Sequence, residues 1–155
     1  GIRYTLRSRG IGDVYKRQVI DLQSLGEKSI VVDCDVIQAD GGTRTASITG
    51  GFVALSLAIK KYMNSNKSIQ NPIKDYVAAV SCGIVRNEVL VDLDYSEDSI
   101  AEVDANFVIT KKSGFSEVQA TGEENTFNKN ELLEMMEKVE LVSEKIFKIQ
   151  KDGLE

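Results

Sequence analysis

Two apolar stripes with the repeat of a helix flank a segment that alternates like strands, and this order limits the fold more than any other feature. The first stripe predicts a helix over about 46–63 and the second a helix over about 129–150. Between them, strands are expected at 76–85, 88–94, 103–110 and 115–120. The sequence therefore predicts an α+β domain in which two long helices cover one face of a mixed or antiparallel sheet. The stripes are Ile48, Phe52, Leu55, Ile59 and Tyr62, and Leu132, Met135, Val139, Val142, Ile146 and Ile149.

The connections between these elements carry their own signals. A short turn at Arg86 and Asn87 should join the first two strands, because asparagine tolerates left-handed backbone. The later strands should continue as a meander. Asn128 and Glu131 form a capping box for the second helix. Within the first helix, the glycine pair at 50–51 suggests close packing against another backbone.

Two elements are expected before the first long helix. Residues 19–25 read as the end of a helix that Gly26 closes, and residues 30–37 read as a strand. In that strand, Ile30, Val32, Cys34 and Val36 would share one side, opposite Asp33 and Asp35.

Composition limits the size of the domain and the class of protein. The chain has 155 residues, of which 42% are hydrophobic, which suits one domain with a substantial core. It has no run of eighteen apolar residues and no apolar segment near its start, so we expect a cytoplasmic protein that does not span a membrane. Cys34 and Cys82 should be buried, reduced thiols. Because the chain has no histidine, any chemistry must rest on carboxylates, arginines, hydroxyls and backbone.

The first eighteen residues differ from the rest. They hold five basic residues, one acidic residue and no sustained periodicity, whereas the whole chain has a net charge of −5. Residues 19–155 therefore carry −9. Residues 13–18 look like the translated end of a sequencing adapter, so we interpret 1–18 as a non-native leader. The other interpretation is a basic arm that binds RNA phosphates.

A glycine-rich turn between the strand at 30–37 and the first long helix is the first candidate site. Such a turn aims free N–H groups and the positive end of a helix dipole at one point, and Arg44 adds a charged fork. Such a fork suits a phosphate better than the point charge of a lysine would. On spacing alone, an equally good interpretation makes Gly41 and Gly42 a tight connection and Thr43 or Thr45 a helix cap.

A carboxylate-rich segment is the second candidate. Its six acids are Asp92, Asp94, Glu97, Asp98, Glu102 and Asp104. Acids this close repel one another unless a cation or an arginine lies among them, and hard oxygen ligands suit Mg²⁺ or Mn²⁺. Without further information, a solvated acidic connection is the more common explanation.

Four motifs in order, at 33–50, 91–99, 101–104 and 117–123, resemble the ribonuclease PH family. The resemblance implies a ribosomal protein S5 domain 2-like fold, of which residues 19–155 would be the C-terminal portion, with an exposed sheet edge and apolar surface. It also implies a phosphorolytic 3′-to-5′ exoribonuclease that trims the 3′ end of precursor tRNA and other structured RNA. Orthophosphate, the co-substrate, would bind Gly42, Thr43 and Arg44. Asp98 and Asp104 would be catalytic and hold Mg²⁺ (or Mn²⁺), with Glu102 as a weaker neighbour.

The family further implies a homohexamer, a trimer of dimers. Much of the family's RNA-facing arginine surface, with a further phosphate-binding arginine, would precede residue 19, and Tyr4 stands where that arginine would align. Two other classes stay open: a non-catalytic ring subunit like those of the exosome, and a phosphate-binding module without RNA chemistry. A polynucleotide phosphorylase half is a close enzymatic rival that the short chain disfavours.

Overall fold

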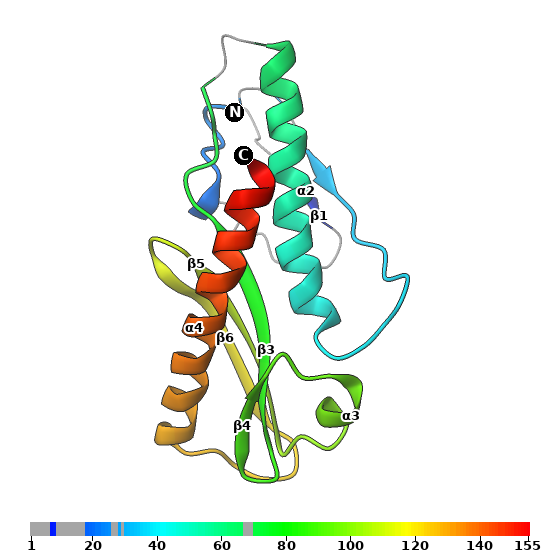
Figure 1. Cartoon of the computed structure of the whole chain (residues 1–155), viewed down its shortest axis with the longest axis vertical. Coiled ribbons are helices and arrows are strands. Elements are labelled where there is room, and N and C mark those ends of the chain that lie inside the picture. Colours follow the sequence, from blue (N-terminus) through cyan, green and yellow to red (C-terminus); the bar gives the residue numbers. More distant parts are fainter. Residues whose placement is uncertain (1–6, 9–17, 26–27, 29, 67–69) are drawn as a thin grey trace.

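The structure is a computed structural model, and it describes residues 7–8, 18–25, 28, 30–66 and 70–155. Two short strands come first, followed by a long helix, a strand pair, a one-turn helix, a second strand pair and a final long helix (Figure 1). The elements are β1 (Arg7–Ser8), β2 (Val31–Val32), α2 (Thr43–Ser65), β3 (Val77–Val85), β4 (Glu88–Val91), α3 (Tyr95–Asp98), β5 (Val103–Thr110), β6 (Gly114–Gly122) and α4 (Lys129–Leu154).

The main sheet is antiparallel and has the strand order β4-β3-β5-β6. The predicted turn between β3 and β4 is confirmed, since Arg86 and Asn87 both have left-handed backbone, with φ of 53° and 63°. The predicted meander is wrong, because β5 pairs with β3 instead of β4. Every residue of β3 is buried, as expected for a strand with a neighbour on each side and packing on both faces.

The two long helices pack on opposite faces of this sheet, so the prediction that they share one face is wrong. Val77 and Ala79 of β3 lie in the core under α2, while the alternate residues Ala78 and Val80 lie in the core under α4. Successive strand residues point to opposite faces, so the two cores are separated by the sheet. Only near the end of α4 do the helices meet, where Lys60 Nζ donates to the carbonyls of Leu154 and Glu155 at 2.8 and 2.9 Å (Figure 1).

The helix boundaries refine the predictions. The helix α2 begins at Thr43, three residues earlier than expected, and the predicted capping box of Asn128 and Glu131 is present at the start of α4. The buried face of α4 turns away from the predicted stripe, so that Ile149 is 71% exposed and Phe147 is 1% exposed. The predicted stripe repeats every 3.5 residues, whereas a straight helix turns every 3.6, and the difference moves the contact face along a long helix.

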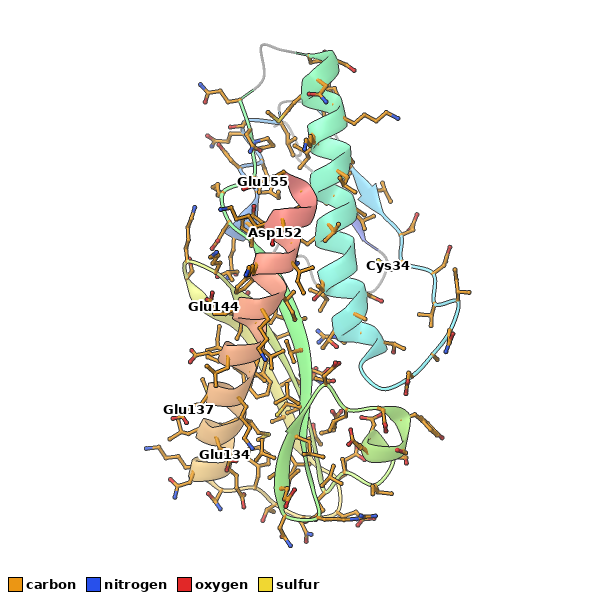
Figure 2. All side chains as sticks on the ribbon, in the orientation of Figure 1. Cys34, Glu134, Glu137, Glu144, Asp152 and Glu155 are labelled. Carbon is orange, nitrogen blue, oxygen red and sulfur yellow. The ribbon has the colours of Figure 1, made fainter. Side chains whose placement is uncertain are left out.

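Acidic side chains on α4 form a solvated face. Figure 2 labels Glu134, Glu137 and Glu144 along this helix, and Glu134 pairs with Lys138 at 2.8 Å. Among the described ranges, no helix is both long and apolar enough to cross a membrane.

The predictions before α2 are mostly wrong. Only Val31–Val32 form a strand, which pairs in parallel with β1, and residues 33–40 are exposed without regular structure. Cys34 is therefore exposed, whereas Cys82 is buried as expected. A strand needs a partner for its backbone groups, and none of the described residues offers one to 33–40. Of the residues around 19 that the structure describes, 18–19 are helical, and Gly26 lies outside the described residues.

An exposed sheet edge and exposed apolar side chains are present, as predicted. The strand β6 lies at one edge of the sheet, and Val36 and Ile37 are 56% and 99% exposed. The interpretation of residues 1–18 as a leader stays a prediction. Arg7 and Ser8 of that segment pair with β2, and Tyr4 lies outside the described residues.

Candidate functional site

The sheet face under α2 is apolar at one end and polar at the other. Val77, Ala79 and Val108 pack beneath the body of the helix. Further along β3, Ser81 lies opposite Asn106, and Gly83 lies opposite Asp104. The same rows continue onto β6 with Gln119 and Thr121. Because residues paired across neighbouring strands point to the same face, this register gathers polar side chains near the N-terminal end of α2.

The glycine turn places that end of α2 against the polar rows. Gly42 is the N-cap residue, with left-handed backbone at φ 71°, and a Cβ built on it would lie 2.9 Å from Ser81 Oγ. The first turn of α2 has no side-chain cap and no acidic residue. No cap or first-turn acid therefore competes for its leading N–H groups, and with the helix dipole they favour an anion.

Arg44 points across the sheet to β6. Its Nη2 donates to Glu117 Oε1 at 2.6 Å, and both side chains are about one-third exposed. Its Nη1 is buried and has no hydrogen-bond partner among the residues that the structure describes, and the same holds for Ser81 Oγ. Since buried polar groups are normally satisfied, two orphaned donors beside uncapped helix N–H groups indicate a place for an acceptor-rich ligand.

The six acids of 92–104 do not form one cluster. Asp94 caps α3 by accepting from Glu97 N at 2.9 Å. A hydrogen bond from Ser96 lowers the pKa of Asp94, helped by Glu97 N. Glu102 accepts from Asn87 N and Asn125 Nδ2 and so braces the β3–β4 turn. Asp92 has left-handed backbone that ends β4.

Asp98 and Asp104 are the two acids that the fold brings together. Asp98 ends α3, and Asp104 lies half-buried on β5. Burial raises the pKa of Asp104, and the negative charges of Asp98 and Glu123 add to the shift. Within the described part of the chain, no group of three or more histidine, cysteine or acidic side chains is arranged to hold a metal ion. Two carboxylates remain enough for Mg²⁺, which usually keeps several waters and shares phosphate oxygens with its ligand.

Sequence reasoning assigned no role to Ser81, Glu123 or Asp40. A serine inside an otherwise apolar central strand was the available signal for Ser81. The partner of Arg44 could not be found from spacing, since Glu117 lies 73 residues away.

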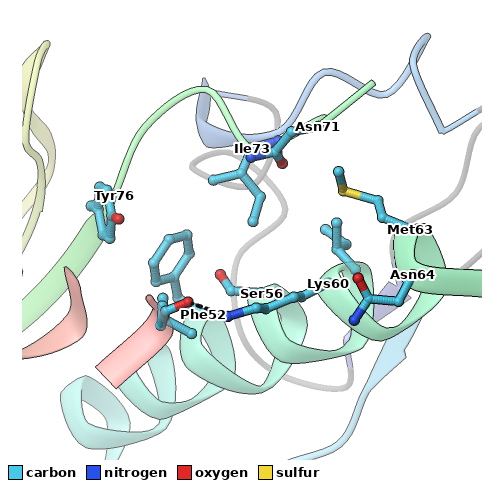
Figure 3. Close-up of a pocket in the computed structure, with 10 residues that line it drawn as sticks. Phe52, Ser56, Lys60, Met63, Asn64, Asn71, Ile73 and Tyr76 are labelled. Atoms are coloured by element: carbon cyan, nitrogen blue, oxygen red, sulfur yellow. Dashed lines mark hydrogen bonds between the residues drawn. The ribbon is translucent and has the colours of Figure 1, made fainter. Parts of the chain in front are cut away.

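A pocket elsewhere on the molecule takes no part in this site. It lies along the C-terminal half of α2, where Phe52, Ser56, Lys60, Met63 and Tyr76 line it (Figure 3). The site described above lies at the other end of that helix.

The chain is similar to known proteins both in sequence and in fold. Residues 75–138 match the 3′ exoribonuclease family, domain 2. Over 139 residues the chain is 51% identical to the Ribonuclease PH of Bacillus cereus (strain AH820), which takes in 89% of this chain and 57% of that protein. The chain thus spans a little over half the length of the curated relatives that it matches.

Two solved structures resemble the fold. A crystal structure of rice (Oryza sativa) Rrp46 matches with a TM-score of 0.73 and 19% identity, over 97% of this chain and 71% of that one. An Archaeoglobus fulgidus exosome with RNA bound to the active site matches with a TM-score of 0.60 and 18% identity, over 80% of this chain and 52% of that one. At these identities the likeness concerns the fold alone, and it confirms the predicted fold class.

Proposed function

Since the chain belongs to the ribonuclease PH family, as a C-terminal portion of it, we propose that it works within a phosphorolytic 3′-to-5′ exoribonuclease. The observation that supports this proposal is that an anion-binding helix start and a pair of carboxylates lie at the same end of one sheet face. The uncapped start of α2 with Arg44 supplies anion donors, and Asp98 and Asp104 supply the carboxylates. Phosphoryl transfer needs both an anion cradle and acidic side chains that handle protons or cations.

Orthophosphate would bind the N–H groups of Gly42 and Thr43 together with Arg44. One of its oxygens attacks the 3′-terminal phosphorus in line, and the bond from that phosphorus to the preceding 3′ oxygen breaks. A nucleoside diphosphate leaves, and the RNA ends one residue shorter with a free 3′ hydroxyl. The proton for that hydroxyl would come from a carboxyl group, either that of Asp98 or that of Asp104.

Asp98 and Asp104 would also hold Mg²⁺ (or Mn²⁺), which when bound supplies positive charge next to the transferred phosphorus. The substrates we propose are the 3′ ends of precursor tRNA and other structured RNA. We propose that the protein acts in the cytoplasm as a homohexamer, a trimer of dimers, in line with the family resemblance.

The test compares residues 19–155 alone with the same segment joined to the preceding portion of a curated relative. Each is incubated with 3′-extended tRNA, Mg²⁺ and orthophosphate, and nucleoside diphosphates are measured. Arg44→Ala and Asp98→Ala should each abolish release from the joined chain. Lys148→Ala and Asp152→Ala, exposed positions on α4, are the matched controls and should leave it unchanged. Monophosphates that form without phosphate, or no release from the joined chain, would contradict the proposal.

A second candidate is a non-catalytic ring subunit. The ion pair of Arg44 with Glu117 favours a non-catalytic role, because the arginine proposed to bind phosphate already has an anionic partner. Phosphate-dependent release of diphosphates that Arg44→Ala abolishes would exclude this candidate.

A further inference from the structure

Asp40 forms hydrogen bonds to two segments of the site, the turn before α2 and the start of α3. Its Oδ1 accepts from Tyr95 N at 2.6 Å and from Gly41 N at 2.8 Å. Gly41 belongs to the turn that leads into α2, whereas Tyr95 is the first residue of α3, 55 positions after Asp40. One carboxylate oxygen therefore bonds the backbone of both segments, and a charged acceptor makes such hydrogen bonds short and strong.

The backbones of these segments are also in direct contact. A Cβ built on Gly41 would lie 2.0 Å from the carbonyl oxygen of Leu93 and 2.9 Å from the carbonyl carbon of Asp94. The two segments can approach this closely only because residue 41 has no side chain. Figure 1 shows the result, with the N-terminal end of α2 lying next to the loop that contains α3.

Each segment holds one part of the proposed machinery. Two residues beyond Asp40, the N-cap Gly42 starts the helix that carries the anion donors. Three residues beyond Tyr95, Asp98 ends α3. The capping box of Asp94 and Glu97 makes α3 a firm single turn, so a bond at its first N–H also fixes its last residue.

We propose that Asp40 is a positioning residue that sets Asp98 at a fixed place relative to the anion donors of α2. This inference rests on the proposed function of the site. Asp40 itself touches neither phosphate nor RNA in this role; it acts through Tyr95 and Gly41. Phosphoryl transfer depends on such placement, because a shift of about 1 Å in a reacting group can lower a rate by roughly a hundredfold.

The test uses the whole chain and two substitutions that separate geometry from charge. Asp40→Asn keeps an oxygen that can accept both N–H groups but loses the negative charge, and Asp40→Ala loses both. Asp35→Asn and Asp35→Ala are the matched controls, because Asp35 is exposed in the same segment and has no hydrogen-bond partner among the described residues. Thermal unfolding first shows that each variant is folded.

Two readouts are taken by NMR: the exchange rate of the Tyr95 amide, and the affinity for orthophosphate from shifts of the Gly42 and Thr43 amides. In Asp40→Ala we expect Tyr95 exchange to rise about tenfold and phosphate affinity to fall about tenfold, as for loss of charged hydrogen bonds. Asp40→Asn should restore both to within about threefold of the original chain. The Asp35 variants should match the original chain.

Three results would overturn the inference. The first is unchanged Tyr95 exchange in Asp40→Ala. The second is an equal loss in Asp40→Asn and Asp40→Ala, since the asparagine keeps the acceptor. The third is tighter phosphate binding in both variants, which would make Asp40 a repelling charge only. If neither the original chain nor the joined chain binds orthophosphate, the proposed function of the site fails, and Tyr95 exchange still decides whether Asp40 couples the two segments.

Discussion

Replacing Gly41 by alanine should destabilise the fold and displace the turn before α2. The added Cβ would lie 2.0 Å from the carbonyl oxygen of Leu93, whereas real Cβ atoms essentially never approach within 3.0 Å, so the two backbones must separate by about 1 Å. Overpacking of this kind costs about 1–3 kcal/mol, and backbone cannot rotate away as a side chain can. Weakening the two hydrogen bonds to Asp40 adds about 1 kcal/mol. We therefore expect a loss of about 2–4 kcal/mol in the free energy of unfolding.

Two other glycines provide matched comparisons. Gly50 lies inside α2, and apart from the neighbouring backbone of this helix no described atom lies within 4 Å of an added Cβ, so Gly50→Ala should stabilise the chain by about 0.5–1 kcal/mol. Gly42 has left-handed backbone, which costs an L-residue about 1–2 kcal/mol, and its Cβ would lie 2.9 Å from the Ser81 hydroxyl. Gly42→Ala should thus fall between the other two.

Urea unfolding followed by circular dichroism at the helix band gives the three free energies, provided that the denaturant slope is the same for all variants. If Gly41→Ala proves as stable as the original chain, the close approach of the turn to Leu93 is wrong. If Gly50→Ala destabilises more than Gly41→Ala, the packing of α2 is wrong.

Three further outcomes are expected. Asp104→Asn, studied without divalent cations, should be slightly more stable than the original chain near neutral pH. That gain should disappear as the pH falls through the raised pKa of Asp104, because the folded state favours the protonated carboxyl; a gain that persists in acid would contradict this. A thiol reagent at pH 8 should label only Cys34 in the folded chain, since burial raises the pKa of Cys82 to about 12. Two labelled thiols without unfolding would disprove the burial of Cys82. Asn128→Ala should lower the free energy of unfolding by about 1 kcal/mol through loss of the α4 cap, with exposed Asn130→Ala as the control.

Helices, strands and turns were predicted correctly where the sequence signal lies within the element itself. Strict alternation gave β5 at 103–110, and the short turn at 86–87 and the cap at Asn128 were read from residue type alone. The pairing of β5 and the placement of the two helices were predicted wrongly, because periodicity shows which residues share a face but not what covers it. The continuous apolar run of β3 was the available signal that both faces of that strand are covered.

The glycine pair at 50–51 also shows that a sequence pattern does not reveal what packs against a residue. Close backbone packing was predicted there, but Gly50 has open space and Gly51 faces only the side chains of Val32 and Cys34, at 3.5 and 3.6 Å. The glycines that do need to be small are Gly41, Gly83 and Gly122, because a Cβ on each would lie closer than 3.0 Å to a backbone carbonyl oxygen. The residue type alone cannot separate these cases, since the backbone that approaches Gly41 and Gly83 comes from a distant part of the chain.

The site was predicted in part. Gly42, Thr43 and Arg44 do lie at the start of a helix, and Asp98 and Asp104 do lie near each other, although their roles in binding and catalysis stay predictions. The contacts that assemble the site, from Asp40 to Tyr95 and from Arg44 to Glu117, join residues 55 and 73 positions apart. Nothing in the composition of either segment identifies its partner.

The strand order has a consequence for how quickly the chain folds. The β3–β4 hairpin closes through a two-residue turn, and such hairpins form in about 1–10 μs. Adding β5 to the other side of β3 requires the whole segment 92–102 to cross the sheet first, which costs loop-closure entropy before any pairing is gained. Since this crossing segment contains α3 and Asp98, substitutions that loosen it should slow refolding as well as change the site.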